Sequence, residues 1–380
     1  MSFDESKNSK RDFLKTCLMC SAGLALGKMI PAAPELYADS RYSKKHSIEA
    51  KYYTRSGENM LCDLCPNECI VLPDKAGDCR TRENHDGKLI SIAYGNPCAV
   101  HSDPIEKKPL FHFLPGTRAF SISTAGCNFR CLNCQNWTIS QRSPRETRNY
   151  DLMPDKVVEY CIKNKNQSIA YTYGEPIAYY EYTYDTARIA HKKGIKNLMI
   201  SCGHIKEKPL KDLAKYIDAA NIDLKGFDQE TYTKLNGGDL NTILNTLQIL
   251  DEENVWLEIT NLIVPNWTDD MNELKRMCKW LVKNGLDKYP LHFSRFMPMY
   301  KLKHLPMTPV STLKKARNIA LDTGMKYVFL GNVPGTDAEN TYCPSCGKMI
   351  IKRRGFMILD NNLENGKCPD CNEKIDGIWH

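Results

Sequence analysis

Hydrophobic and polar positions along the chain take on a regular alternation from about residue 118. From there on, short apolar runs typical of β-strands are separated by stretches with helical spacing. The predicted strands are 118–124, 168–173, 196–201, 220–225, 255–264, 290–296 and 326–331. The predicted helices include one that opens at Pro154 and others at 177–192, 209–217 and 310–323. Strands that alternate with helices predict βαβ units and a parallel sheet, and six or seven such units predict a full or partial barrel.

Three cysteines, Cys127, Cys131 and Cys134, follow the first predicted strand in the stretch STAGCNFRCLNCQNW. In barrels and in open α/β sheets, chemistry collects beyond the carboxyl ends of the strands. The loop that carries these cysteines is therefore the predicted position of a catalytic group.

The chain has 17 cysteines, and eleven of them fall into three tight groups. Thiolates a few residues apart can point at one ion, whereas disulfide frameworks spread their partners, so we expect metal ligation rather than disulfides. The groups are Cys62, Cys65, Cys69 and Cys79; Cys127, Cys131 and Cys134; and Cys343, Cys346, Cys368 and Cys371. Of the six scattered cysteines, Cys161, Cys202 and Cys278 are predicted to be small buried hydrophobic residues.

The first and last cysteine groups predict two further metal sites. Residues 60–80 are rich in turn formers, which predicts a small loop-dominated knuckle that binds zinc or a second iron–sulfur cluster. Near the C-terminus, CPSC and CPDC stand 21 residues apart, as in a zinc ribbon. Four thiolates close a tetrahedral site and leave no open position, so this group predicts structural zinc in preference to iron.

Composition places the chain among ordinary soluble globular proteins, with 42% apolar and 26% charged residues. The 380 residues can bury a full core without covalent staples. The formal net charge of +7 comes from lysines scattered along the chain rather than from one basic block. A solvated surface explains this charge better than a nucleic-acid groove does, so a zinc-ribbon nucleic-acid binder is a poorly supported function.

The segment at 9–38 has the pattern of a targeting sequence, with a basic pair, a short apolar run and a Pro/Ala-rich tail. The apolar run is interrupted by Lys28 and is too short for a membrane span, and no other segment predicts one. The stretch SKRDFLK resembles a twin-arginine export signal with Lys10 in place of the first arginine, which predicts export or membrane tethering. The alternative is a disordered or helical tail.

Three thiolates can hold a [4Fe-4S] cluster by three corners and leave the fourth iron free to bind a substrate. In this context the chain resembles the radical SAM superfamily, and within it the AmmeMemoRadiSam-system radical SAM enzymes, which are relatives of the pyruvate formate-lyase activating enzymes. Six segments in the same order carry the resemblance: CDLCPNEC, DPIEKKPLFHFLPG, GCNFRCLNCQNW, TYGEP, IDLKG and HFSRFMP.

The resemblance implies an α/β fold with a partial (β/α)6 TIM-like barrel at 118–335. The N-terminal cysteine-knuckle region would occupy 41–117 and the zinc-ribbon-like module 336–380, after the signal-like segment at 1–40. It also implies that S-adenosylmethionine binds the open iron through its amino and carboxylate groups. Reductive cleavage would then release methionine and a 5′-deoxyadenosyl radical that abstracts hydrogen from an unidentified substrate, in an activating or modifying reaction.

Tyr173, Gly174 and Glu175 match the family's glycine-rich segment after the second strand. The resemblance implies that this segment contacts the methionine amino group mainly through its backbone, and Glu175 would equally suit a helix N-terminus.

Two positions depart from the family pattern. Asn133 stands where relatives usually carry an aromatic ring near the adenine, and Gly174 stands where close relatives often have asparagine.

Asp223 and Lys225 alternate with Ile222 and Leu224, so the two charged side chains share one face of the strand end. The resemblance implies that both lie beside the methionine carboxylate and that Lys225 pairs with it. The alternative is an internal Asp–Lys ion pair. His292 matches the family's last-strand histidine near the adenine, and its alternative is a structural role.

The resemblance further implies a low-potential electron donor of the flavodoxin or ferredoxin type, and AmmeMemo-type partner proteins or a protein substrate. S-adenosylmethionine and strong reductants are cytoplasmic, which conflicts with the export signal. The alternative function is a non-catalytic iron–sulfur electron carrier with structural zinc modules.

Overall fold

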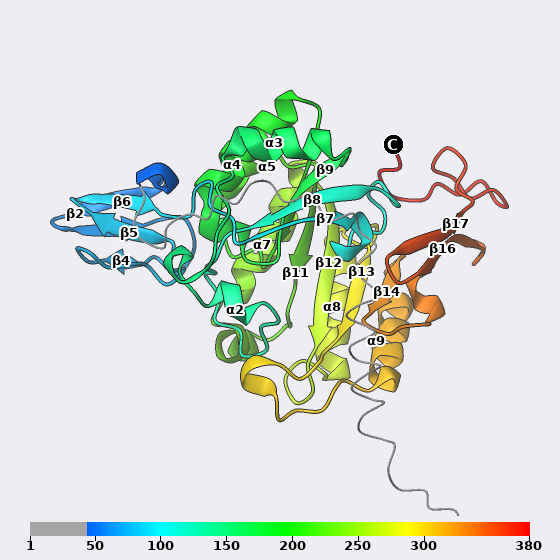
Figure 1. The fold of residues 1–380 in the computed structure, drawn as a ribbon. Coiled ribbons are helices and arrows are strands. Elements are labelled where there is room, and N and C mark those ends of the chain that lie inside the picture. Colours follow the sequence, from blue (N-terminus) through cyan, green and yellow to red (C-terminus); the bar gives the residue numbers. More distant parts are fainter. Residues whose placement is uncertain (1–43) are drawn as a thin grey trace, which may run out of the picture. The chain divides into compact units, whose positions relative to one another are not determined.

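The computed structural model describes residues 44–380, so the export signal predicted at 1–40 lies outside the described residues. The described part is built on an eight-stranded sheet in the order β14-β13-β12-β11-β10-β9-β8-β7 (Figure 1). Strands β8 to β14 run parallel, and β7 pairs antiparallel with β8. The strands are β7 Ala99–Pro104, β8 Arg118–Ser123, β9 Ser168–Tyr171, β10 Lys196–Ser201, β11 Ala219–Asp223, β12 Trp256–Ile263, β13 Leu291–Arg295 and β14 Val328–Gly331. The seven predicted strands are present as β8 to β14, which confirms the parallel α/β sheet, whereas β7 was not predicted.

The helices that follow the strands start and end at recognisable signals. Pro154 takes the first position of α3, where its missing N–H costs nothing. Asp239 and Asp270 cap α7 and α8 by accepting hydrogen bonds from Thr242 N and Asn272 N. The helices are α2 Trp137–Ser140, α3 Pro154–Lys163, α4 Tyr180–Lys192, α5 Glu207–Ala214, α6 Gln229–Thr231, α7 Leu240–Glu252, α8 Met271–Lys283 and α9 Val310–Thr323. Shorter turns are η1 Lys44–His46, η2 Ile105–Lys107, η3 Pro144–Glu146, η4 Pro176–Tyr179, the π-helical η5 Tyr232–Asn236, η6 Tyr300–Leu302 and η7 Asp337–Glu339.

The sheet has one face against helices and one that we call the inner face. Asn261 of β12 points at helix α8, because its Nδ2 lies 3.7 Å from Met277 Sδ. Its neighbour Thr260 therefore points to the opposite, inner face. In-register pairing places Asp223 and His292 beside Thr260, so all three share the inner face.

The segment between β7 and β8 packs against the inner face. Ile105, Leu110 and Phe113 form a buried cluster with residues of four strands, namely Ala119, Ala170, Leu198 and Ala219. Polar groups fix the same segment: Glu258 accepts backbone hydrogen bonds from Phe111 N at 2.9 Å and His112 N at 2.7 Å. These two buried backbone donors thus have a partner, which holds the segment in place.

The N-terminal cysteine region consists of two small antiparallel sheets rather than only loops. The sheets have the strand orders β2-β3-β4 and β1-β6-β5. Their strands are β1 Ile48–Glu49, β2 Tyr53–Ser56, β3 Asn59–Cys62, β4 Ile70–Val71, β5 Arg82–His85 and β6 Lys88–Ser91. A buried ion pair between Arg82 and Glu181 and a 2.6 Å hydrogen bond from Thr81 Oγ1 to Ala178 O join this region to the start of α4 and the end of η4.

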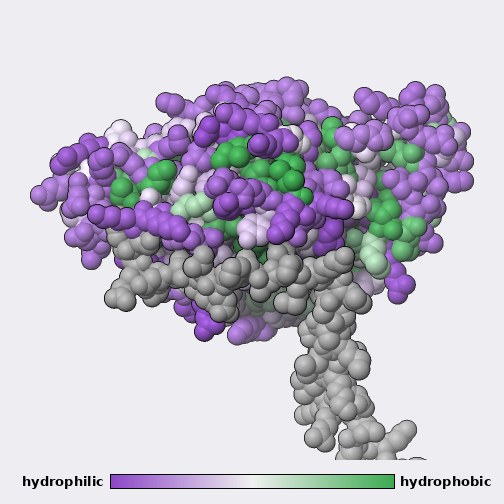
Figure 2. All heavy atoms as spheres, turned by 45° about the horizontal axis from the view of Figure 1, so that its top comes forward, coloured by the Kyte–Doolittle hydropathy of each residue, from purple (hydrophilic) through white to green (hydrophobic). Residues whose placement is uncertain are grey.

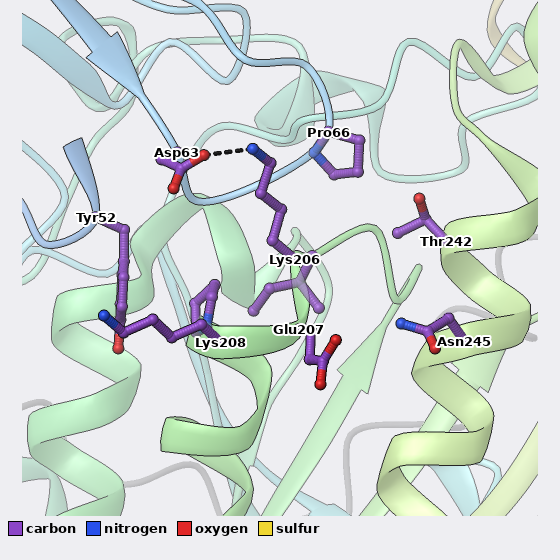
Figure 3. A pocket seen from close by; sticks show the side chains of 10 residues that line it. Tyr52, Asp63, Pro66, Lys206, Glu207, Lys208, Thr242 and Asn245 are labelled. Carbon is purple, nitrogen blue, oxygen red and sulfur yellow. Dashed lines mark hydrogen bonds and ion pairs between the residues drawn. The ribbon is translucent and has the colours of Figure 1, made fainter. Parts of the chain in front are cut away.

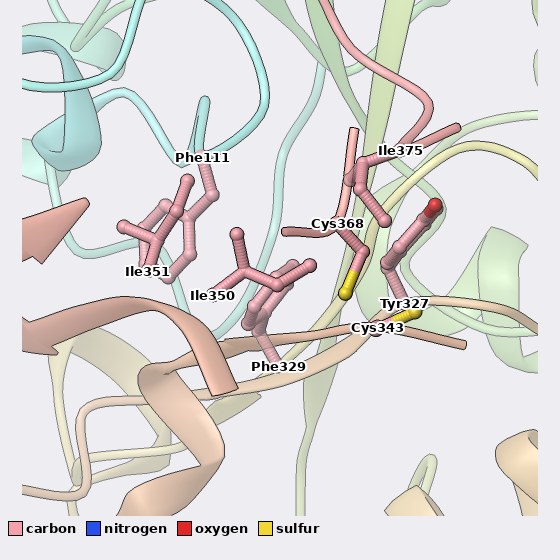
Figure 4. Close-up of a cluster of buried hydrophobic side chains, with 8 residues drawn as sticks. All are labelled: Phe111, Tyr327, Phe329, Cys343, Ile350, Ile351, Cys368 and Ile375. Atoms are coloured by element: carbon pink, nitrogen blue, oxygen red, sulfur yellow. The ribbon is translucent and has the colours of Figure 1, made fainter. Parts of the chain in front are cut away.

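The C-terminal residues form a third small sheet, β15-β16-β17, with β15 Thr341–Tyr342, β16 Met349–Arg354 and β17 Met357–Asn361. A shared hydrophobic cluster joins it to β14 and to the segment between β7 and β8 (Figure 4). Its members are Phe111, Tyr327, Phe329, Cys343, Ile350, Ile351, Cys368 and Ile375. Two cysteines of the last group, Cys343 and Cys368, are therefore part of a hydrophobic core and not of a free tail.

The surface shown in Figure 2 is mainly hydrophilic, with separate hydrophobic areas. Within residues 44–380, no helix has the length and apolar character needed to cross a bilayer.

Candidate functional site

The three-cysteine loop runs from the end of β8 to the start of α2. Cys127, Cys131 and Cys134 are all half-buried along it. Two backbone hydrogen bonds tie the loop to η5, from Arg130 N to Asn236 O at 2.8 Å and from Leu132 N to Leu235 O at 2.9 Å. The cysteines are thus presented by a fixed backbone beyond the carboxyl end of a strand, where the sequence predicted them.

The spacing of their sulfurs differs from that of a single-ion site. Among the residues that the structure describes, Cys343, Cys346, Cys368 and Cys371 are the one group of three or more potential metal ligands whose ligand atoms all lie within 4.8 Å of one another. Zn–S bonds of about 2.3 Å in tetrahedral geometry place sulfurs about 3.8 Å apart. The C-terminal group matches this closely, with 3.6 Å between the sulfurs of Cys343 and Cys371 and 3.7 Å between those of Cys346 and Cys368.

Two predicted site residues act electrostatically on the three-cysteine loop. Burial raises the pKa of the Cys131 thiol to about 12, and the nearby Lys225 ammonium acts in the opposite direction. Burial, and next to it the Glu175 carboxylate, raises the pKa of the Cys127 thiol. Glu175 therefore acts on Cys127, and Lys225 on Cys131, through their charges.

The segment after β9 approaches the cysteine loop closely. Tyr173 has a left-handed backbone with φ of 64°, and its carbonyl accepts a 2.6 Å hydrogen bond from Asn136 Nδ2. A Cβ atom on Gly174 would lie 2.8 Å from Ser123 Oγ and 2.9 Å from Thr124 O. Any residue larger than glycine would collide with these atoms, so the packing of this chain requires glycine at position 174.

Glu175 is buried and its carboxylate is fully used inside the protein. Oε1 accepts hydrogen bonds from Ser201 Oγ at 2.6 Å and Ile177 N at 3.2 Å, and Oε2 accepts one from Cys202 N at 2.8 Å. The residue caps η4 and ties the end of β9 to the end of β10. Glu175 therefore caps a helix in the structure, which was the alternative to a cofactor contact in the sequence analysis.

Asp223 and Lys225 form the internal ion pair that was the alternative to a carboxylate site, with 2.6 Å between Lys225 Nζ and Asp223 Oδ2. The Lys225 side chain is 20% exposed and that of Asp223 38% exposed, so the pair is open to solvent. Ile222 and Leu224 are both fully buried, as their alternation with the charged residues predicted.

His292 lies on the inner face with a partner that the sequence did not identify. Its Nε2 lies 2.6 Å from Glu258 Oε2, and both side chains are buried. The ring stacks on Phe329 and meets the Phe111 ring edge-on. The apolar strand VWLEITNLIV contains Glu258 as its single acid, which is the signal that could have revealed a buried partner.

A second polar network at the inner face was also missed. The Tyr173 hydroxyl donates to Asp103 Oδ2, and Lys108 Nζ lies 2.6 Å from the same carboxylate oxygen. Lys108 is 1% exposed, and burial lowers its pKa to about 8 although Asp103 acts in the opposite direction. The charged run DPIEKK marks Asp103 and Lys108, but nothing local in the sequence connects them to Tyr173.

Asn133 is 7% exposed, and its Oδ1 has no hydrogen-bond partner within the described residues. An unpaired buried amide oxygen destabilises the folded protein. A hydrogen-bond donor on a bound ligand would therefore stabilise this position. The residue precedes Cys134 and lies in the loop discussed above.

The N-terminal cysteines share a small cavity. Cys62, Cys65, Cys69 and Cys79 all line it, together with Asn128 of the three-cysteine loop.

A separate surface pocket of about 360 Å³ lies between the N-terminal region and the chain that leads into α5 (Figure 3). Lys206 and Asp63 form an ion pair in this pocket. None of the predicted site residues lines it.

Several known proteins are similar to this chain. The family model described as the radical SAM superfamily matches residues 121–281. The uncharacterized protein MJ0808 of Methanocaldococcus jannaschii is 45% identical over 331 residues, which cover 86% of this chain and 98% of that protein. The pyruvate formate-lyase 1-activating enzyme of Escherichia coli is 25% identical over 57% of this chain and 93% of its own length. A radical SAM methyltransferase from Sphaerobacter thermophilus superposes with a TM-score of 0.46 at 15% identity, over 62% of this chain and 71% of that one. On its matched sequence and its parallel α/β sheet, the chain belongs to the radical SAM superfamily.

Proposed function

We propose that this chain cleaves S-adenosylmethionine reductively at a [4Fe-4S] cluster held by Cys127, Cys131 and Cys134, and that the radical so formed modifies or activates a substrate. The observation that carries the proposal is the geometry of the three-cysteine loop: three half-buried cysteines on a fixed backbone beyond β8, with sulfurs spread more widely than a single ion requires.

The residues around the loop fit the group that membership of the superfamily implies. Three thiolates leave one cluster iron without a protein ligand. The open, partly exposed ion pair of Asp223 and Lys225 places an ammonium near Cys131. The unpartnered Oδ1 of Asn133 offers a hydrogen-bond acceptor beside Cys134. When bound, the cluster supplies the electron that divides S-adenosylmethionine into methionine and a 5′-deoxyadenosyl radical.

Each proposed cofactor contact has a defined task. The backbone of Tyr173 to Glu175 would bind the methionine amino group, while the Glu175 side chain holds that backbone through Ser201 and Cys202. Lys225 would pair with the methionine carboxylate in place of Asp223. His292, fixed by Glu258, lines the inner face on the adenine side.

Several finer assignments belong to the same proposal. The motifs from CDLCPNEC to HFSRFMP support an AmmeMemoRadiSam-system enzyme, with a radical SAM core at 118–335 flanked by cysteine modules at 41–117 and 336–380. A low-potential flavodoxin or ferredoxin would supply the electron. The similarity to an activating enzyme supports a protein substrate. The sulfur distances in the C-terminal group support zinc there.

The test is production of 5′-deoxyadenosine by the anaerobically reconstituted protein after reduction with dithionite. We expect the wild-type chain to form it and Cys127→Ala to form none. The matched control is Cys278→Ala, which changes a buried cysteine of α8 outside all three groups and should retain the activity. Equal yields from Cys127→Ala and the wild type would refute the proposed site, and a wild-type protein without activity would favour an electron carrier.

A further inference from the structure

The four N-terminal cysteines form one site without the geometry of a zinc site. All four side chains line the same cavity. No three of their sulfurs lie within 4.8 Å of one another, whereas all four sulfurs of the C-terminal group of this chain do. The C-terminal group serves as an internal reference, because it shows what a compact four-thiolate site looks like in the same structure.

A two-iron cluster would need its cysteine sulfurs in two close pairs. In a [2Fe-2S] cluster two cysteines share each iron, so their sulfurs would come as close as at tetrahedral zinc, about 3.8 Å. The C-terminal group has such close pairs, at 3.6 and 3.7 Å. The hydrogen bonds to the sulfurs of Cys62, Cys69 and Cys79 instead come from Arg82, Asp78 and Thr81. In a [4Fe-4S] cluster each cysteine binds a different corner, which spreads the sulfurs around the cube.

Hydrogen-bond donors surround the sulfurs of this cavity. Arg82 Nη1 lies 3.4 Å from Cys62 Sγ, and Asp78 N lies 3.4 Å from Cys69 Sγ. Donors of this kind balance the negative charge of a thiolate-bound cluster and tune its potential. Arg82 is 1% exposed and is itself held by the ion pair with Glu181, so a fixed positive charge borders the cavity.

The cavity adjoins the three-cysteine loop directly. Asn128, which follows Cys127 in sequence, forms part of its wall. Asn67 Nδ2 of the N-terminal region donates to Asn128 O at 3.0 Å. On the other side, a Cβ atom on Gly126 would lie 2.6 Å from Cys79 O, so the two cysteine segments are in backbone contact.

From this geometry we propose that Cys62, Cys65, Cys69 and Cys79 bind a second, fully ligated [4Fe-4S] cluster beside the Cys127 loop. In that position the cluster takes one electron from a low-potential flavodoxin- or ferredoxin-type donor and passes the same electron to the Cys127 site, returning to its oxidised state. The electron transfer rests on the proposed function of the Cys127 site, whereas binding of this second cluster does not, because its four ligands are complete without a small molecule.

Metal and sulfide counting on the anaerobically reconstituted full chain tests the proposal. We expect about eight iron and eight sulfide per wild-type chain, together with one zinc at the C-terminal group. The triple variant Cys127→Ser/Cys131→Ser/Cys134→Ser should keep about four iron, and Cys65→Ser/Cys79→Ser should lose about four iron and keep its zinc. Cys278→Ala is the control and should match the wild type.

A wild-type chain with about four iron and two zinc, or a Cys65→Ser/Cys79→Ser variant that loses zinc instead of iron, would overturn the proposal. The triple variant distinguishes failure of this proposal from failure of the Cys127 site. If the Cys127 site bound no cluster, the triple variant would contain as much iron as the wild type. The EPR spectrum of the reduced protein tests whether the two clusters lie next to each other. We expect a wild-type spectrum altered by spin interaction, and a simple sum of the two variants' spectra would contradict the shared wall at Asn128.

Discussion

Gly126, directly before the first loop cysteine, is expected to tolerate no side chain. Its φ is 103°, a conformation that L-residues rarely adopt. An added Cβ would lie 2.4 Å from Thr81 Cγ2 and 2.6 Å from Cys79 O, and the second of these atoms belongs to the backbone. Neither neighbour is the free end of a flexible side chain, so the contact between the two cysteine segments would have to open.

The expected cost of Gly126→Ala has two parts. Backbone strain at such a φ costs roughly 1–3 kcal/mol. Overpacking against fixed atoms costs roughly another 1–3 kcal/mol. The matched control is Gly194→Ala, where φ is 70° but no atom lies within 4 Å of the added Cβ, so only the strain remains. Replacing glycine by alanine also restricts the unfolded chain, and this effect is common to both variants and cancels in the comparison.

The assay is urea unfolding of the anaerobic protein followed by tryptophan fluorescence, with iron content measured on the same samples. We expect Gly126→Ala to unfold at clearly lower urea than Gly194→Ala, with a gap of about 2 kcal/mol, and to lose iron that the control keeps. If the two variants unfold at the same urea concentration and retain the same iron, the close approach of Cys79 to the three-cysteine loop is wrong.

Three further perturbations test other parts of the site. Burial lowers the pKa of His204 to about 4, below its unfolded value of about 6.5, so folding stability should fall as pH drops from 6.5 towards 4, by up to about 3 kcal/mol. His204→Leu should flatten this dependence in urea titrations, and an unchanged pH profile would show that the histidine is not the titrating group. Lys225→Met should weaken S-adenosylmethionine binding by about tenfold or more in anaerobic calorimetry, while Lys234→Met, at an exposed surface pair, should leave it unchanged. Cys346→Ser should remove the zinc that we propose at the C-terminal group without lowering the iron content, whereas a loss of iron would place iron at that group.

The sequence predicted those features of the fold that depend on local pattern. The run 196–201 is β10 in full, and α9 has the predicted bounds of 310–323, because each is set by its own periodicity and its flanking turns. The strand predicted at 168–173 ends earlier, at Tyr171, because Tyr173 takes a left-handed conformation that no strand can continue.

Features that join distant residues escaped prediction. Tyr173 and Asp103 are 70 positions apart, and Glu258 and His292 are 34 apart, so neither pair leaves a local signal. The turn-rich composition of residues 60–80 hid strands β3 and β4, because strands this short have too few positions to show an alternation. The cysteine spacing indicated a metal at the N-terminal group, but the choice between zinc and a cluster depends on sulfur separations that sequence does not contain.

The most direct measurement of the central claim is electron–nuclear double resonance on the reduced protein with S-adenosylmethionine labelled at its amino nitrogen and carboxylate oxygen. If Cys127, Cys131 and Cys134 leave one iron for this molecule, both labels will couple to the cluster spin, and the coupling will vanish in Cys131→Ala. Spectra that are identical with and without the labels would contradict the account, because they would show that S-adenosylmethionine does not complete the cluster.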